Sequence, residues 1–401
     1  MARVITTGID IGSSTVRIVT AEQKKDGGLN VLAAVQKESE GVKRGYITNL
    51  EAAAKTISVA IKSAEKISSI PIKRVVVSVG GISLGSVRAK GMVRTSKVDG
   101  EITEHDVKRL IAQSEANLAN VSNKRVIHRF PLAFKVDNNF VHGRPTELKG
   151  TKLEVETLFI TYLNQHLSDL IKTVESAGLV IDDIVAAPLA MSCAVLTKQQ
   201  KETGCILTNI GASTVSVVVF EEDLPISLEV FPIGSSHITN DIALGLRVPL
   251  DEAEQIKLKY GADTSVPKRK LLDIVEARLN DIFEMIESHL KKINRNEVLP
   301  AGIILTGSGS NLFSLEEIAK ASLRLPAKVG SLLPRANHSL NISATSSNLR
   351  EQILNDPGWS VAVGLCIASI DESCLPFESG RNGSGRSVLS TIKKWVSSLL
   401  P

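Results

Sequence analysis

The sequence is poor in aromatic residues, with two tryptophans, three tyrosines and nine phenylalanines among 401 residues. The hydrophobic cores must therefore be built from Ile, Val, Leu and Ala. Proteins that bind single-stranded nucleic acid stack its bases on exposed aromatic rings, so we expect no nucleic-acid partner. The net charge is a mild +4, and residues 379–401 hold four basic side chains and no acidic one. The basic excess therefore belongs to the C-terminal end.

Cysteines and long apolar runs are also scarce. The four cysteines, Cys193, Cys205, Cys366 and Cys374, have no close metal-ligand spacing, so we expect reduced thiols in a cytosolic protein. Residues 1–20 have a strand pattern and no apolar signal segment. No run approaches the ~20 apolar residues that span a bilayer. Together these absences predict a protein that is made and kept in the cytosol.

The chain contains one stretch twice, near its start and near its midpoint. Aligned without gaps, Gly8–Val19 and Leu207–Val218 share identical residues: Ile11, Gly12, Ser14, Thr15, Val16 and Val19 recur as Ile210, Gly211, Ser213, Thr214, Val215 and Val218. Each copy predicts two strands joined by a tight turn, whose N–H groups and hydroxyls can face an anion. One copy alone could be a plain Gly-Ser turn. Two copies, each opening about half of the chain, indicate two related lobes around one ligand.

A third stretch, Gly302–Asn311, predicts a strand that runs into a glycine-rich turn, with a helix over Leu315–Ala321 close behind it. These three stretches resemble the two phosphate hairpins and the adenosine loop of the actin-like ATPase superfamily. Three further motifs narrow the resemblance to the FtsA family: Lys43–Leu50, Gly234–Ala243, and Ala253–Lys257 followed by Tyr260-Gly261. The likeness covers nearly the whole chain.

FtsA proteins are actin-like bacterial proteins that tether the division ring to the membrane. The resemblance therefore implies cell division and septum formation as the process, and ATP with Mg²⁺ as cofactors. It also implies self-association into filaments and binding of the C-terminal tail of FtsZ, the tubulin-like division protein. The expected location is the cytoplasm, peripheral on the inner face of the cell membrane and on its anionic lipid.

We expect an α/β, actin-like two-lobed fold: duplicated mixed sheets with flanking helices, an inserted small α+β domain and a C-terminal amphipathic helix. The insertion is indicated where alternating strands interrupt the βαβ rhythm, from about Leu84. Pro188–Leu196 and Ser360–Ile370 resemble the superfamily's two connecting helices. The predicted parts are the lobe-one core (1–83 and 163–200), the inserted domain (84–162), the lobe-two core (201–225 and 301–375), the lobe-two small domain (226–300), a flexible linker (376–386) and a membrane-binding helix (387–401).

Candidate ligand-binding residues come from the repeated turns. Gly12 and Gly211 let the backbone approach an anion, and Ser13, Ser14, Ser213 and Thr214 offer hydroxyl donors beside Ala212. Arg17 either adds charge on the phosphate side or is an outward-facing strand residue. The resemblance places Gly307, Ser308 and Gly309 on the adenosine side. It also places Glu254 and Lys257, which share a helix face at i and i+3, around the ribose and base; a solvated surface pair is the alternative.

Hydrolysis requires acids to hold the Mg²⁺ shell and to orient the attacking water. Asp10 matches the acid of the first hairpin and would hold Mg²⁺ through water. The second hairpin carries Asn209 and Ser216 where the family pattern has aspartates. Ala187 stands where many relatives have a glutamate. We therefore name no catalytic residue and expect ATP to bind with weak or absent hydrolysis.

The resemblance places the FtsZ-tail site within residues 226–300. The long amphipathic helix predicted over Lys268–Ile293 ends in a basic turn, with Lys291, Lys292 and then Arg295, which suits an acidic peptide. Helix C-termini favour cations in any case, so part of this signal is structural.

The last fifteen residues predict an amphipathic helix after a linker rich in glycine and serine. Its apolar residues fall on one face, with Lys393 and Lys394 on the other, a pattern that suits the lipid headgroup boundary. A terminal helix docked on the body is the alternative. The apolar face consists of Val388, Leu389, Ile392, Trp395, Val396, Leu399 and Leu400.

Two other readings of the whole chain stay open at this point. One is a small-molecule kinase of the same fold, against which the missing acids at 209 and 216 argue. The other is an actin-like adaptor for pilus assembly, which would not need a terminal amphipathic helix.

Overall fold

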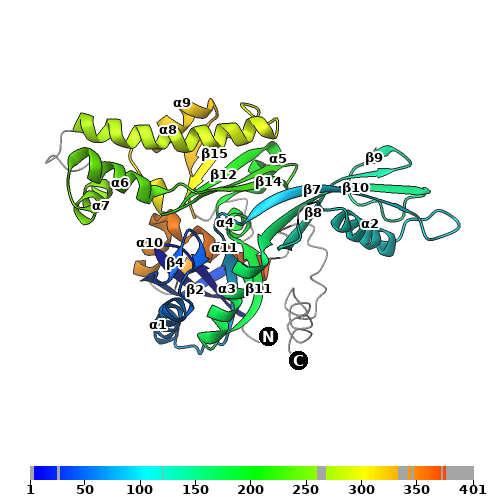
Figure 1. Cartoon of the computed structure of the whole chain (residues 1–401). Coiled ribbons are helices and arrows are strands. Elements are labelled where there is room, and N and C mark those ends of the chain that lie inside the picture. Colours follow the sequence, from blue (N-terminus) through cyan, green and yellow to red (C-terminus); the bar gives the residue numbers. More distant parts are fainter. Residues whose placement is uncertain are drawn as a thin grey trace.

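The computed structural model describes residues 4–24, 28–119, 121–259, 268–332, 342–344, 347–371 and 374–375. Within them the chain forms two lobes with a domain that projects to one side (Figure 1). The predicted linker and terminal helix, 376–401, lie outside the described residues.

Lobe one is built on a mixed sheet with the strand order β11–β6–β1–β2–β3–β17. Strands β1, β2 and β3 form an antiparallel meander, and β6 and β11 run parallel to β1. Helix α1 (Leu50–Ser68) packs an Ala- and Ile-rich stripe against this sheet and begins at Asn49, whose side chain accepts from the N–H of Ala52. The strands are β1 (Ile5–Ile11), β2 (Thr15–Gln23), β3 (Leu29–Glu38), β6 (Arg74–Val79), β11 (Val180–Ala186) and β17 (Ile342–Ala344).

Lobe two repeats this plan in the order β14–β13–β12–β15–β16, again with a three-strand meander followed by two parallel strands. The two hairpin turns close in the same way. Gly12 N–H donates to Thr15 O and Gly211 N–H donates to Thr214 O, each at 3.0 Å. The predicted duplication is therefore confirmed. The strands are β12 (Cys205–Ile210), β13 (Val215–Glu221), β14 (Leu224–Phe231), β15 (Ile303–Thr306) and β16 (Ala327–Val329).

Two buried helices cross between the lobes, as the resemblance implied. Helix α4 (Ala187–Val195) and helix α11 (Ser360–Ile370) lie in the same hydrophobic core as the lobe-one sheet. They approach so closely that a Cβ on Gly364 would lie 1.9 Å from the carbonyl oxygen of Ala190. A glycine is therefore required at this crossing.

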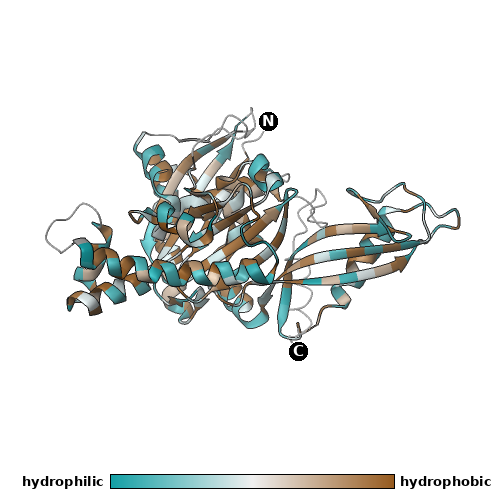
Figure 2. Ribbon diagram, turned by 90° about the horizontal axis from the view of Figure 1, so that it is seen from above, coloured by the Kyte–Doolittle hydropathy of each residue, from teal (hydrophilic) through white to brown (hydrophobic). Residues whose placement is uncertain are grey.

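The helices of lobe two pack on their own core. The long helix α8 (Lys268–Lys292) runs along the outside of the lobe, apolar toward the sheet and polar toward solvent (Figures 1 and 2). The helices α6 (Ser235–Leu246) and α7 (Leu250–Leu258) lie beside one of its ends, and α9 (Leu315–Leu323) packs against it. Helix α6 begins at Ser235, where its first turn is bonded to the second hairpin.

The inserted domain is a four-stranded sheet in the order β7–β10–β8–β9, with α2 (Glu104–Ala116) on one face and a separate core. Its first strand also touches lobe two. The Ser86 hydroxyl accepts from Leu228 N–H at 2.8 Å and donates to Leu228 O at 2.9 Å, and Arg88 donates to Ile226 O at 2.8 Å. The strands are β7 (Gly85–Arg94), β8 (Lys124–Val136), β9 (Asn139–Val141) and β10 (Lys152–Leu163).

Short elements escaped the sequence-based reading because they carry little periodicity. They are β4 (Val42–Lys43), β5 (Tyr46–Ile47), β9, α5 (Lys198–Thr203), the 3₁₀ turns η1 (Ser308–Asn311) and η2 (Pro357–Trp359), β16, β17 and α10 (Ser347–Asn355). Helix α3 (Asn164–Ser176) follows β10 directly and packs against α1.

The expectation of four reduced thiols is wrong for one pair. Cys193 on α4 and Cys374 are joined in a disulfide, with their Cα atoms 5.5 Å apart. The Lys201 ammonium donates to the carbonyl oxygen of Cys374 at 3.2 Å. Cys205 and Cys366 are buried free thiols.

No single helix in the described part of the chain is long and apolar enough to cross a membrane. Helix α10 and the segment Pro357–Ile370 are together long and apolar enough for such a span, but the pair is bent by 90°.

Candidate nucleotide site

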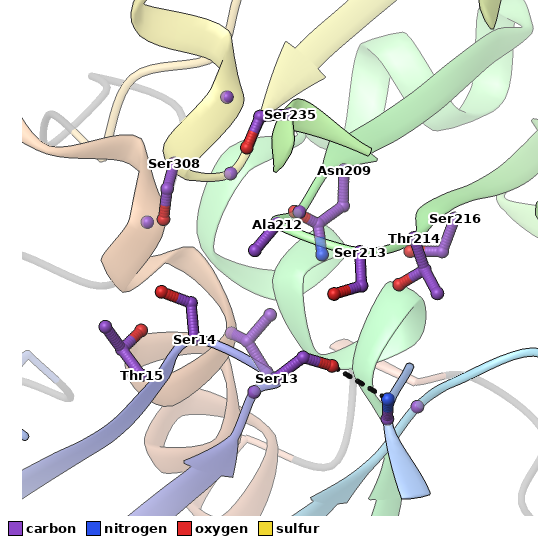
Figure 3. A pocket seen from close by; sticks show the side chains of 18 of the residues that line it. Ser13, Ser14, Thr15, Asn209, Ala212, Ser213, Thr214, Ser216, Ser235 and Ser308 are labelled. Carbon is purple, nitrogen blue, oxygen red and sulfur yellow. Dashed lines mark hydrogen bonds between the residues drawn. The ribbon is translucent and has the colours of Figure 1, made fainter. Parts of the chain in front are cut away.

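A cavity of about 320 Å³ lies between the two lobes. The turns of both hairpins, the loop after β15 and the helix α7 line it, and the hydroxylated side chains of the two turns face each other across it (Figure 3). Every ligand residue that the sequence indicated is in its lining: Asp10, Gly12, Ser13, Ser14, Arg17, Gly211, Ala212, Ser213, Thr214, Glu254, Lys257, Gly307, Ser308 and Gly309.

The turn of the first hairpin is held by its surroundings. The Ser13 hydroxyl oxygen accepts from Gly45 N–H at 2.8 Å, which leaves its own hydrogen free to be donated elsewhere (Figure 3). Asp10, at the end of β1, accepts from the Ser78 hydroxyl at 2.8 Å. Burial raises the pKa of Asp10, while the Ser78 hydrogen bond and the charge of Arg17 oppose that rise. A cation beside Asp10 would favour its charged form.

Arg17 is almost fully buried, so the outward-facing alternative is wrong. Its guanidinium donates to Gln36 at 3.0 Å and to the Ser308 hydroxyl at 3.0 Å, and it lies 3.7 Å from the Asp356 carboxylate. The centroid of the Trp359 ring is 5.7 Å away. Arg17 therefore links β2 of lobe one to the loop after β15 in lobe two, and it brings positive charge to the cavity lining.

The turn of the second hairpin is fastened to the start of α6. Ser235 N–H donates to Gly211 O at 2.9 Å and Ser236 N–H donates to Ala212 O at 2.8 Å. A Cβ on Gly234 would lie 2.6 Å from Ala212 O. The N-terminal end of α6, which favours negative charge, is thereby brought to the cavity wall.

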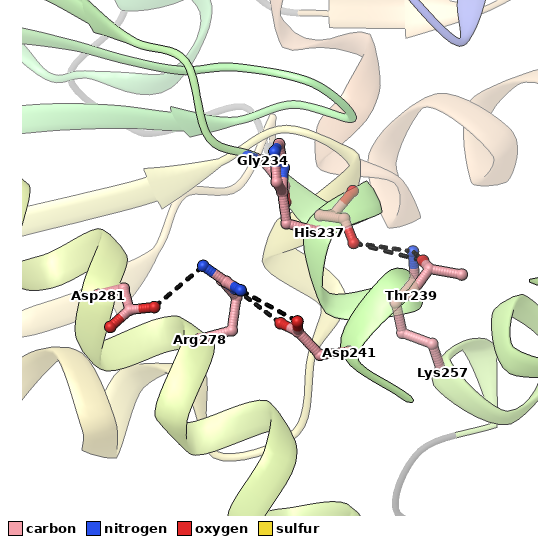
Figure 4. A network of polar contacts seen from close by, with 8 residues as sticks. Gly234, His237, Thr239, Asp241, Lys257, Arg278 and Asp281 are labelled. Atoms are coloured by element: carbon pink, nitrogen blue, oxygen red, sulfur yellow. Dashed lines mark hydrogen bonds and ion pairs between the residues drawn. The ribbon is translucent and has the colours of Figure 1, made fainter. Parts of the chain in front are cut away.

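On the opposite wall, Lys257 and Glu254 form a buried pair, so the solvated-surface alternative is wrong for the lysine. Lys257 is 8% exposed and its ammonium donates to Glu254 at 2.7 Å and to the Thr239 hydroxyl at 2.8 Å (Figure 4). The Thr239 hydroxyl also donates to Glu254, at 2.6 Å. Burial alone would raise the pKa of Glu254, but the hydrogen bonds from Lys257 and Thr239 lower it.

The loop after β15 approaches the second hairpin at Gly307. Its backbone has φ 89° and ψ 169°, a region that only glycine adopts readily. A Cβ there would lie 2.1 Å from Asn209 Oδ1 and 2.7 Å from Ile210 O. The loop after β15 and the second hairpin thus touch through a position that has no room for a side chain.

The three positions at which the sequence departs from the acidic family pattern carry no carboxylate in this cavity. Asn209, Ser216 and Ala187 do line it, as their places in the motifs predicted. Among the described lining residues, the only carboxylates are Asp10 and Glu254, and Glu254 is committed to Lys257. The described residues also hold no cluster of three or more His, Cys, Asp or Glu side chains that could bind a metal. The described lining thus combines hydroxyl groups, glycine backbone and two basic side chains, Arg17 and Lys257, with these two carboxylates.

Sequence reasoning missed several lining residues. Ser78 lies at the end of a buried strand and Gly80-Gly81 follows it, a strand-to-glycine pattern like that of Gly307. Ser235 and Ser236 belong to a motif that was recognised but given no role. Their position at a helix start after a glycine was the available signal.

The three basic residues proposed to bind the partner peptide lie in different environments in the structure. Lys291 pairs with Glu287 at 2.8 Å and Arg295 pairs with Glu221 at 2.5 Å. Lys292 instead lines a groove between the end of β14 and α8, and it has no ion-pair partner among the described residues. The groove is lined by Glu229, Phe231, Pro232, Ile233, Arg278, Asp281, Glu284, Met285, Ser288, His289 and Lys292.

One wall of this groove is rigid. Arg278 on α8 donates to both carboxylate oxygens of Asp241, at 2.6 and 3.0 Å, and also to Asp281 at 3.0 Å (Figure 4). This bidentate pair joins α8 to α6.

Solved structures share this architecture at low sequence identity. The chain in the PilM–PilN type IV pilus biogenesis complex matches with a TM-score of 0.68 at 16% identity, over 92% of this chain and 100% of that one. MreB5 of Spiroplasma citri, solved with bound ADP, matches with a TM-score of 0.52 at 11% identity over 98% of each chain. With its duplicated lobes, connecting helices and interlobe cavity, the molecule has an actin-like fold.

Sequence comparison identifies the family to which this chain belongs. The family model described as "Cell division protein FtsA" matches residues 206–364, and the model of the SHS2 domain inserted in FtsA matches residues 81–161. The cell division protein FtsA of Borreliella burgdorferi is 30% identical over 92% of this chain and 91% of its own length. That of Pseudomonas aeruginosa is 28% identical over 97% of this chain and 96% of its own. The chain belongs to the FtsA family of cell division proteins, which favours neither the kinase nor the pilus adaptor.

Proposed function

We propose that this chain is a division adaptor that binds ATP with Mg²⁺ between its lobes, self-associates into filaments and tethers FtsZ to the inner face of the cytoplasmic membrane at the septum. The observation that carries the nucleotide part is the single cavity in which both hairpin turns meet the loop after β15. The family and the actin-like fold support the rest.

The residues present fit ATP. The two turns offer backbone N–H groups and hydroxyl donors at Ser13, Ser14, Ser213 and Thr214, which suit a triphosphate. Lys257 and the glycine-rich loop lie on the adenosine side. Asp10 would hold Mg²⁺ through water, and the ion would neutralise phosphate charge. The ADP held by the related fold of MreB5 supports a nucleotide here.

The experiment that tests this proposal is a titration of the purified protein with a fluorescent ATP analogue, with and without Mg²⁺. Saturable binding that unlabelled ATP displaces is expected. Binding should weaken when Mg²⁺ is chelated. No displaceable binding at millimolar ATP would refute the nucleotide role.

Turnover is expected to be weak or absent, because no placed carboxylate can orient the attacking water. ATP would then act as a structural ligand that closes the lobes and favours the polymer. Phosphate release from the lipid-bound protein should stay well below about one per second, a rate at the low end for enzymes. Steady turnover at that rate would make the chain an active ATPase. Asn209→Asp with Ser216→Asp restores the two motif acids and tests whether they alone raise the rate.

The proposed seat of the FtsZ tail is the groove between β14 and α8. Its lining combines apolar side chains, including Phe231 and Met285, with the ammonium of Lys292. A short peptide with apolar anchors and acidic residues fits this combination. Lys291 and Arg295, which pair within the chain, contribute less to this proposal.

The proposed membrane anchor is the terminal helix of residues 387–401. One short helix that lies in the interface binds reversibly, so a filament presenting many copies should bind by avidity. Trp395→Glu should release the protein from anionic vesicles, whereas Trp395→Phe should keep it bound. Co-sedimentation with and without ATP measures both effects. Unchanged binding after deletion of residues 387–401 would place the anchor elsewhere.

A further inference from the structure

The joint between lobe one and the inserted domain gathers two of the chain's three tyrosines and a histidine. The chain enters this domain after β6 and leaves it at the end of β10. At this place Tyr46, Ser83, Tyr162 and His166 form one contact group, which we call the joint cluster. The Tyr46 and His166 rings stack with centroids 3.9 Å apart, and Tyr162 meets His166 edge-on at 6.2 Å.

Ser83 joins the joint cluster to the entry of the inserted domain. Its hydroxyl lies 3.1 Å from His166 Nδ1. Ser83 is 8% exposed, and a broken contact would leave a buried polar group unpaired, which is costly. The entry to the domain, the exit strand and Tyr46 are therefore linked through His166.

Tyr46 ties the joint cluster to the nucleotide cavity through a single tight turn. It opens β5, and the turn between β4 and β5 has two central residues with positive φ, Arg44 at 51° and Gly45 at 79°. Two-residue turns of this kind are stiff because the hairpin fixes both residues. Gly45 N–H donates to Ser13 Oγ in the first phosphate hairpin at 2.8 Å.

The same turn is in close backbone contact with the entry to the inserted domain. A Cβ on Gly45 would lie 2.5 Å from the Cα of Gly81, and a Cβ on Gly81 would lie 2.6 Å from Arg44 O. Both glycines line the cavity. A shift of the turn by even a fraction of an ångström must therefore move either the Ser13 contact or the entry strand, since close-packed backbone cannot absorb it.

The inserted domain has a second contact that can report such a shift. Ser86 and Arg88, a few residues beyond Ser83, are hydrogen-bonded to the backbone of β14 in lobe two. The domain is thus held at one end by the joint cluster and along its first strand by the other lobe. Together these two attachments hold the inserted domain in one orientation, which we call its docked posture.

We infer that the joint cluster couples phosphate occupancy at Ser13 to the posture of the inserted domain, with Tyr46 as the positioning residue. The inference rests on the proposed nucleotide binding and adds the route by which the ligand acts on a distant surface. A contiguous set of contacts joins Ser13 to the inserted domain. Phosphate binding at Ser13 and the contacts of the inserted domain would both bias the equilibrium between keeping and losing the docked posture.

The test is hydrogen–deuterium exchange of the full chain, with and without saturating ATP–Mg²⁺, read by mass spectrometry. In the unaltered protein ATP should change exchange both in the hairpin peptides and in peptides from β7 and β14. In Tyr46→Leu the hairpin response should remain, and the response in β7 and β14 should be lost. Tyr46→Phe, which keeps the ring stack with His166, should retain the response in β7 and β14.

A second variant guards against a folding defect in the first. His166→Leu should also lose the distant response, whereas His105→Leu, at an exposed histidine on α2, should behave as the unaltered protein. If ATP binds but leaves β7 and β14 unchanged, or if the Tyr46 and His166 variants respond fully, the inference is wrong and the nucleotide function stands. If ATP does not protect even the hairpins, both fail.

Discussion

Gly307 allows a sharp test of the nucleotide cavity. Gly307→Ala adds one methyl group where the loop after β15 meets the second hairpin. The new Cβ would lie 2.7 Å from the carbonyl oxygen of Ile210, a backbone atom in the hairpin itself, and 2.1 Å from the Asn209 side chain. Asn209 can swing away, but the carbonyl cannot without moving the turn.

Two costs add at this position. The backbone conformation, with φ 89° and ψ 169°, costs an alanine about 1–3 kcal/mol. The collision then separates the adenosine-side loop from the phosphate-side turn by several tenths of an ångström or more. A ligand that must touch both would lose contacts, and we expect ATP affinity to fall at least tenfold, or ~1.4 kcal/mol.

Gly143→Ala is the matched control. Gly143 also has positive φ, at 78°, but no atom lies within 4 Å of a Cβ placed there. It therefore carries a backbone cost without the collision, and it lies in the inserted domain away from the cavity. Circular dichroism should show both variants folded, and titration with a fluorescent ATP analogue should separate them. Equal ATP affinity in the two variants would refute the reasoning.

Three further predictions concern other parts of the chain. Lys292→Glu should weaken binding of a labelled FtsZ C-terminal peptide severalfold by fluorescence anisotropy, while Lys291→Glu, outside the groove, should not; equal effects would move the site. Burial, with the nearby charge of Lys292, lowers the pKa of His289 to about 4. The unfolded chain, in which a histidine titrates near 6.5, therefore takes up this proton first. Stability should then fall as pH drops from about 6.5 toward 4, and His289→Gln should flatten that fall in urea titrations at several pH values. Intact mass after alkylation in denaturant, without reductant, should show Cys193 and Cys374 unmodified, and prior reduction should make both reactive; four alkylated thiols without reductant would show that the bond is absent.

The repeated motifs predicted the centre of the fold because their chemistry is local. A turn such as that at Gly12 needs a glycine and small polar residues between two apolar strands, and both copies kept that pattern. The contact between Glu254 and Lys257 was also predictable, because i and i+3 positions meet on any helix. Local pattern could not tell whether that pair was exposed, since its burial depends on Thr239 and the rest of α6.

Contacts between segments that are distant in the sequence could not be predicted from local patterns. Cys193 and Cys374 are 181 residues apart, and nothing in either neighbourhood marks the other. Strand β17 extends the lobe-one sheet although it lies within the sequence of lobe two. The pairing of Arg295 with Glu221 follows from how α8 ends beside β13, which no spacing rule predicts.

The hydrogen bonds from Ser86 and Arg88 to β14 also bear on solubility. β14 is the outermost strand of its sheet, and an uncovered outer strand presents backbone groups that can recruit a strand from another molecule. The inserted domain occupies the Leu228 and Ile226 groups that would do so. A molecule whose inserted domain moves away from β14 therefore exposes a strand edge that can pair with another molecule. Variants that loosen this contact should be watched for aggregation before any loss of activity is assigned to them.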